Sequence, residues 1–117
     1  MKKIAIAILI GISTARGMDE KKAVQLSGEQ VSNIRGAIWI AEGGAKAHYA
    51  YGVTSEPYHS LSEARQICEN SIRNNSARWV ASGMTNNFIP FMAQRYCPLD
   101  QKNWTRNVEF YCKHPKT

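Results

Sequence analysis

The sequence lacks the residue patterns that indicate a metal centre or a nucleic-acid-binding surface. It holds only three cysteines and three histidines among 117 residues. No Cys-x-x-Cys occurs, and His48, His59 and His114 are too widely scattered to form a ligand pair, so we expect no metal site. No run of lysine and arginine is interleaved with aromatic residues, which argues against nucleic acid as a partner. We expect no cofactor.

Long hydrophobic runs are absent except for one at the N-terminus. Met1-Lys2-Lys3 precedes a short apolar run over residues 4–12, and small residues follow it, as in a secretory signal peptide. The run is shorter than the roughly 20 apolar residues of a membrane-spanning helix. We therefore predict a signal peptide over residues 1–17, cleaved after Ala15 or Gly17, and no permanent membrane span. An uncleaved anchor and a buried N-terminal strand are the alternatives.

The remaining chain, residues 18–117, has the length of one small domain. The proposed signal peptide contains three of the basic residues and no acidic one, so its removal lowers the net charge from +6 to about +3. A modest positive charge favours approach to an anionic cell wall or membrane surface. We expect an exported monomer, in the periplasm or outside the cell.

The three cysteines are Cys68, Cys97 and Cys112. Export would place them in an oxidising compartment, where one disulfide is plausible. The spacing leaves all three pairings open. We prefer Cys68–Cys97, because this bond would tie the middle helix of the domain to the next one.

Hydrophobic periodicity and capping signals predict a mainly α-helical domain. Ser27 and Gln30 read as a capping box, and Gly43-Gly44 should end the helix that follows it. We expect further helices over residues 61–82 and 88–97, and a fourth that is capped by Asn103 and carries Trp104, Val108 and Tyr111.

Residues 45–59 differ from these helices because they are rich in tyrosine and contain glycine and proline. This composition predicts an ordered loop or a short, irregular hairpin. Tyr49, Tyr51 and Tyr58 could line a groove that binds sugars, since tyrosine offers both an apolar face and a polar edge. The alternative is that these side chains cover the core.

Glu42 is the candidate catalytic residue. It lies in line with Ile34 and Ile38 on one helical face, at the last turn before the double glycine. Burial and the partial negative charge at a helix C-terminus both favour the protonated acid, which is the form that glycoside cleavage requires. A solvated glutamate followed by a glycine C-cap is the alternative.

Most glycosidases use two carboxylates, and the sequence offers Glu42 few partners. Glu63 is expected to cap a helix and Glu69 to lie on a solvated face, which leaves Glu56 in the loop. A mechanism with a single carboxylate therefore fits better.

Four segments together resemble the lysozyme-like superfamily, in particular lytic transglycosylases and small phage-type muralytic domains. They are Ala41-Glu42-Gly43-Gly44, Tyr51-Gly52-Val53-Thr54, residues 91–98 and residues 103–108. The match in order covers about residues 27–112. The Glu-Ser, Gly-Leu-Met-Gln and Ala-Tyr-Asn motifs of soluble lytic transglycosylases are absent.

The resemblance implies a small lysozyme-like helical domain whose irregular or β-like loop forms one wall of a cleft. It implies that Glu42 is catalytic and that Tyr51, Thr54 and Tyr96 bind substrate, with Tyr49 added from the loop. The implied activity is cleavage between N-acetylmuramic acid and N-acetylglucosamine in peptidoglycan, with the glycan strand as partner. A non-catalytic secreted domain that binds glycan or protein, and a structural component of an envelope-spanning or phage particle, are the alternatives.

Overall fold

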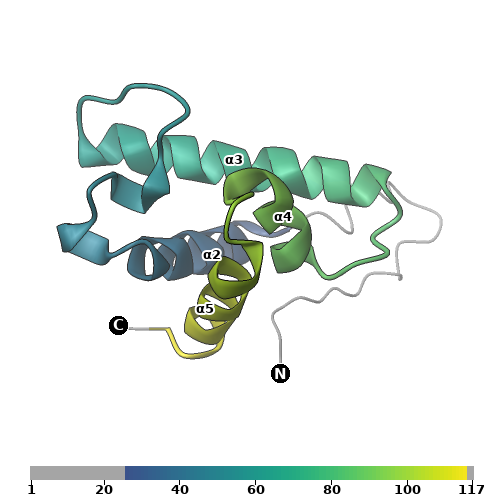
Figure 1. Ribbon diagram of the computed structural model, residues 1–117. Helices are drawn as coiled ribbons and strands as arrows, with labels where there is room; N and C mark the ends of the chain where they lie inside the picture. The colour runs from purple at the N-terminus through teal and green to yellow at the C-terminus, as the bar shows by residue number, and fades with distance from the viewer. Residues whose placement is uncertain (1–25, 116–117) are drawn as a thin grey trace.

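Four α-helices account for most of the part of the chain that the computed structural model describes, residues 26–115 (Figure 1). They are α2 (Gly28–Ala41), α3 (Leu61–Ala81), α4 (Phe88–Tyr96) and α5 (Gln101–Lys113). Two single-turn 3-10 helices, η2 (Gly44–Lys46) and η3 (Ala50–Gly52), lie between α2 and α3, and residues 26–115 contain no strand. The mainly helical class is therefore confirmed. The predicted signal peptide lies outside the described residues.

The first two long helices begin where their capping signals predict. Ser27 Oγ accepts the N–H of Gln30 at 3.0 Å, and Gln30 Oε1 accepts the N–H of Ser27 at 2.8 Å, which completes the capping box of α2. Ser60 Oγ accepts the N–H of Glu63 at 3.1 Å at the start of α3. The Glu63 carboxylate accepts the N–H of His59 instead of that of Ser60.

Helix α5 begins at Gln101, so its N-cap is Asp100 and not Asn103, which the sequence predicts. The backbone explains the difference. The N–H of Trp104 donates to the carbonyl of Asp100 at 3.1 Å, so the first helical turn already encloses Asn103. Asn103 Nδ2 donates to Asp100 Oδ1 at 3.0 Å, within that turn.

The core forms where the four helices meet. Ile38 of α2, Ile72 of α3, Met92 of α4 and Val108 of α5 are all fully excluded from solvent. Helix α5 packs against α2 and α4, and α3 packs against the same two helices. Figure 1 shows α3 running along one side of the molecule, with the segment between α2 and α3 folded over one end. This packing brings the end of α2 close to the loop and to α5.

The segment between α2 and α3 is an ordered loop with two 3-10 turns, not a hairpin. It packs against both α2 and α3 through η3. Within residues 26–115, no helix combines the length and the apolar composition required to cross a membrane.

Truncation of Ile38 tests the position of the core. Replacing this fully buried side chain by alanine should lower the free energy of unfolding by about 2–5 kcal/mol, since it removes packed methylene groups and leaves a cavity. Leu99 is 99% exposed, and Leu99→Ala should change stability by less than about 0.5 kcal/mol. Urea unfolding of both variants measures the difference. An equal loss of stability in the two variants would show that Ile38 does not belong to the core.

Candidate active site at the end of helix α2

Glu42 is the C-cap residue of α2, and its backbone still belongs to the helix. Its N–H donates to the carbonyl of Ile38 at 2.9 Å. Gly43 then turns the chain away with a φ of 112°, a left-handed conformation that favours glycine. The glutamate side chain is half-buried. The helix thus ends with a carboxylate that points toward Trp104 and Gly52.

The Glu42 carboxylate lies directly against the backbone of Gly52 in η3. A Cβ atom added to Gly52 would lie 2.5 Å from Cδ of Glu42, and 2.6 and 2.8 Å from its two oxygens. Gly52 also has a φ of 70°, which most side chains disfavour. Only glycine therefore allows the loop to approach the end of α2 this closely.

Trp104 of α5 supplies the hydrogen bond that orients the carboxylate. Its indole Nε1–H donates to Oε2 of Glu42 at 3.0 Å, across 62 residues of sequence. The Trp104 ring is buried and lies 5.2 Å from the ring of Tyr96. Because the indole occupies Oε2, the other oxygen of Glu42 is the one left to carry a proton.

Tyr96 of α4 fixes the loop beside the glutamate. Its hydroxyl donates to the carbonyl of Tyr51 at 2.6 Å. Tyr51 has a φ of 58°, so a bulky residue is held in the left-handed region. Its ring packs against Trp39 of α2 at 4.9 Å. The hydroxyl and the ring contact together hold the conformation that places Gly52 under Glu42.

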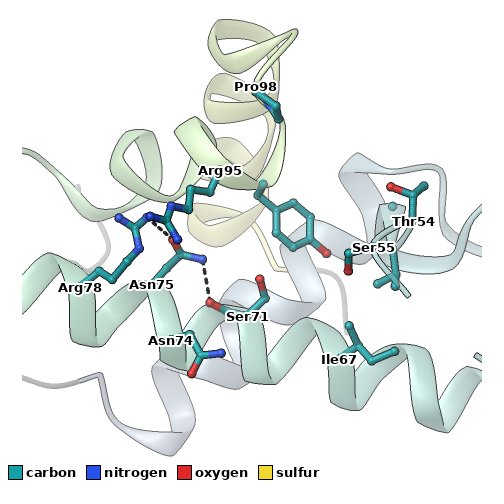
Figure 2. A pocket seen from close by; sticks show the side chains of 12 residues that line it. Thr54, Ser55, Ile67, Ser71, Asn74, Asn75, Arg78, Arg95 and Pro98 are labelled. Carbon is teal, nitrogen blue, oxygen red and sulfur yellow. Dashed lines mark hydrogen bonds between the residues drawn. The ribbon is translucent and has the colours of Figure 1, made fainter. Parts of the chain in front are cut away.

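A pocket of about 520 Å³ opens beside this arrangement, between the loop, α3 and the end of α4 (Figure 2). The loop contributes residues 52–55, and Tyr96 stands at the wall formed by α4. Glu42 does not line the pocket, but its carboxylate touches Gly52, which does. Gly52 therefore lies between the Glu42 carboxylate and the pocket.

The four residues that the sequence predicts as substrate-binding occupy different settings in the structure. Thr54 and Tyr96 line the pocket. Tyr51 is buried and contributes its carbonyl and ring to the support of the loop. Tyr49 is 48% exposed, makes an edge-to-face ring contact with His48 and lies outside the pocket lining. Their roles in binding stay predictions.

Three residues of this site carry roles that the sequence analysis missed. Trp104 is predicted only as a residue of the fourth helix, but its indole N–H donates to the glutamate. Gly52 looked like a loop residue, but it contacts the carboxylate. Arg78 lies in a predicted helix without an assigned role, but it lines the pocket. No sequence signal identifies Trp104, because its partner is remote in the chain; the Tyr-Gly pair at 51–52 does mark a tight turn.

All three cysteines are free thiols in the structure, and Cys68 and Cys97 do not lie at disulfide distance. The pairing preferred from the sequence is not formed here and stays a prediction for the exported protein. Burial raises the pKa of the Cys68 thiol to about 12, and burial raises that of Cys112 to about 12 as well.

Burial, followed by the adjacent Cys68, raises the pKa of the Tyr96 phenol well above its usual range. The Tyr96 hydroxyl therefore keeps its proton near neutral pH and can donate it to the carbonyl of Tyr51.

Within residues 26–115, no group of three or more histidine, cysteine, aspartate or glutamate side chains is arranged to hold a metal ion. The comparisons with known proteins add no assignment: no family model, no curated protein and no solved structure matches the chain. The functional inference therefore rests on the geometry of the site.

Gly52→Ala tests the close contact between the loop and Glu42. The added methyl group would clash with the carboxylate, so we expect the side chain to move away and its bond to Trp104 to break. The indole N–H resonance of Trp104 in a ¹H–¹⁵N spectrum reports that bond. Gly36→Ala in helix α2 is the matched control, because its methyl group would meet nothing within 4 Å. An unchanged Trp104 resonance in Gly52→Ala would contradict the contact.

The buried thiols and phenol predict instability at high pH. Cys68 and Cys112 ionise near pH 9 in the unfolded chain and near 12 in the folded one. The folded state thus keeps protons that the unfolded state loses, and stability should fall as pH rises through this window. Each group contributes at most about 1.4 kcal/mol per pH unit. Urea unfolding in reductant at pH 8 to 11 measures the decline, and Cys112→Ala should make it shallower. If stability fell equally steeply with pH in Cys112→Ala, the Cys112 thiol would not be a cause of the decline.

Proposed function

We propose that the protein cleaves the glycan strands of peptidoglycan, with Glu42 as the single catalytic carboxylate. The observation that carries the proposal is the setting of this side chain. It is half-buried, bonded to Trp104 through one oxygen, and pressed against a glycine that lines a large pocket. A general acid needs such a fixed orientation and partial shelter from water next to a substrate groove.

The chemistry follows from the two oxygens of Glu42. Trp104 holds Oε2, so the protonated form carries its hydrogen on Oε1 and can transfer it to the glycosidic oxygen between the two sugars. The bond from the anomeric carbon to that oxygen then breaks. The acetamido group of the substrate stabilises the positive charge that develops on the ring.

The carboxylate that remains acts as the base in the second step. It takes the proton from the 6-hydroxyl of the N-acetylmuramic acid residue, whose oxygen then attacks the anomeric carbon. The product is a 1,6-anhydro ring, and Glu42 regains its proton. The same group serves as acid and then as base, so the reaction consumes no water. A lytic transglycosylase of lysozyme-like fold works in this manner.

The other carboxylates near this end of the molecule support a mechanism with one acid. Glu69 forms a salt bridge with Arg35, and Glu63 accepts a backbone N–H at the start of α3. Glu56 is exposed in the loop. A hydrolase would require one of them to act as a second catalytic group, and Glu56 is the one whose side chain is not engaged in an ion pair among the described residues.

Glu42→Gln tests the proposal. The amide keeps the size of the side chain and can still accept the Trp104 bond, but it cannot deliver and retrieve a proton. We expect a folded protein whose clearing of purified peptidoglycan falls by at least about a hundredfold. Turbidity loss of a cell-wall suspension measures the rate, and thermal unfolding checks that the variant is folded. Retained activity in this variant would end the proposal.

Glu56→Gln is the matched control. It should retain activity if Glu42 acts alone, whereas loss of activity would indicate a hydrolase with two carboxylates. Mass spectrometry of the released muropeptides separates the two outcomes independently. An anhydro product is lighter than the hydrolysed product by one water. Glycan binding without turnover in the parent protein would instead favour a non-catalytic binding domain.

A further inference from the structure

The end of the pocket away from Gly52 is strongly basic. Arg78, near the end of α3, and Arg95, in the last turn of α4, both line it. Figure 2 shows the two side chains reaching toward each other beside Asn75. Neither arginine forms a salt bridge with any residue between 26 and 115, where the ion pairs are Arg35–Glu69 and His59–Glu63. Two positive charges thus share one wall of the pocket without a carboxylate between them.

The fold holds Arg78 in this position. Its guanidinium donates to Oδ1 of Asn75 at 2.7 Å and lies over the ring of Phe91 at 4.7 Å. Asn75 is itself only 5% exposed, and its amide donates to the carbonyl of Ser71 at 2.8 Å. Desolvation, followed by the charge of Arg95, lowers the pKa of Arg78, as expected for two adjacent cations. The asparagine in the middle of α3 therefore orients an arginine whose remaining donors stay available.

A pair of guanidinium groups with free N–H donors is suited to a carboxylate, which binds arginine through two parallel hydrogen bonds. The distance along the pocket restricts which carboxylate fits. Ile67 and Arg78 lie at opposite ends of the lining contributed by α3, 11 residues apart, which corresponds to about 16 Å of helix. This exceeds the length of one sugar ring.

We propose that Arg78 and Arg95 bind a carboxylate of the peptide stem that N-acetylmuramic acid carries, so that the protein prefers peptide-bearing glycan to bare glycan. The inference rests on the proposed function, which places the sugar beside Gly52 and Glu42. The stem then extends along the pocket from the muramic acid ring to the two arginines. Ser71 of α3 lies between the two ends and offers its hydroxyl group to the peptide (Figure 2).

Binding to the Glu42→Gln variant tests this inference without turnover. The probes are a GlcNAc–MurNAc disaccharide with a tetrapeptide stem, the same disaccharide without its peptide, and chitotetraose, which has no carboxylate. We expect the tetrapeptide probe to bind at least about tenfold more tightly than the other two, since its terminal carboxylate accepts charge-assisted hydrogen bonds from the two guanidinium groups. Calorimetry at low and high salt measures the affinities, and the preference should shrink at high salt.

Arg95→Gln in the same background should remove most of this preference and leave chitotetraose binding unchanged. Arg95 is exposed, so the substitution should not disturb folding. Arg78→Lys is the second variant: it keeps the charge but loses the forked geometry, and it should weaken tetrapeptide binding partially. Arg73→Gln, on an exposed part of α3 outside the pocket lining, is the control and should have no effect.

Equal affinity for the three probes would overturn the inference, as would a tetrapeptide preference that survives in Arg95→Gln. Competition by inorganic phosphate at the same concentration as the tetrapeptide probe would also overturn it, because the site would then recognise any small anion. Failure of the proposed function gives a different result. If the preference depends on the arginines but the parent protein does not cleave peptidoglycan, the anion site stands and the catalytic assignment falls.

Discussion

The close approach of the Glu42 carboxylate to the bare Cα of Gly52 is the contact on which the rest of the site depends. It leaves no room for a Cβ atom at position 52 unless the Glu42 side chain moves, and the φ of 70° at Gly52 disfavours other residues as well. The remaining interactions serve to keep the two elements there. Trp104 holds the carboxylate from α5, and Tyr96 holds the loop from α4. Groups from α4, α5, η3 and the end of α2 therefore meet around the Glu42 carboxylate and the loop beside it.

Helix α3 has a different part in the molecule. Its buried face supports the core through Ile72, while its neighbouring residues form the floor of the pocket. The same helix carries Cys68, whose thiol neighbours the Tyr96 hydroxyl. Tyr96 thus lines the pocket and also holds the loop that contacts Glu42. A ligand in the pocket would contact the same side chain that holds the loop under Glu42, so binding and positioning of the glutamate are physically connected.

Sequence patterns predicted the helices well because their signals are local. Ser27 and Ser60 each cap a helix through hydroxyl groups that lie three residues from their partners. The start of α5 was misplaced because Asp100 and Asn103 are both good cap residues, and only the turn after α4 selects the first. Helix α3 continues through Asn75, whose amide group donates to the carbonyl of Ser71 one turn earlier and accepts a hydrogen bond from Arg78.

The sequence alone was sufficient for the helical class, the loop over residues 45–59, and the placement of Glu42 at the end of an apolar face. These follow from periodicity, glycine and caps, which act over a few residues. The tertiary structure decided which groups meet that carboxylate. Trp104 and Gly52 reach it from elements that are distant in the chain, and Arg78 meets Arg95 in the same way. Such pairs are set by the packing of the helices against one another, and no local pattern encodes them.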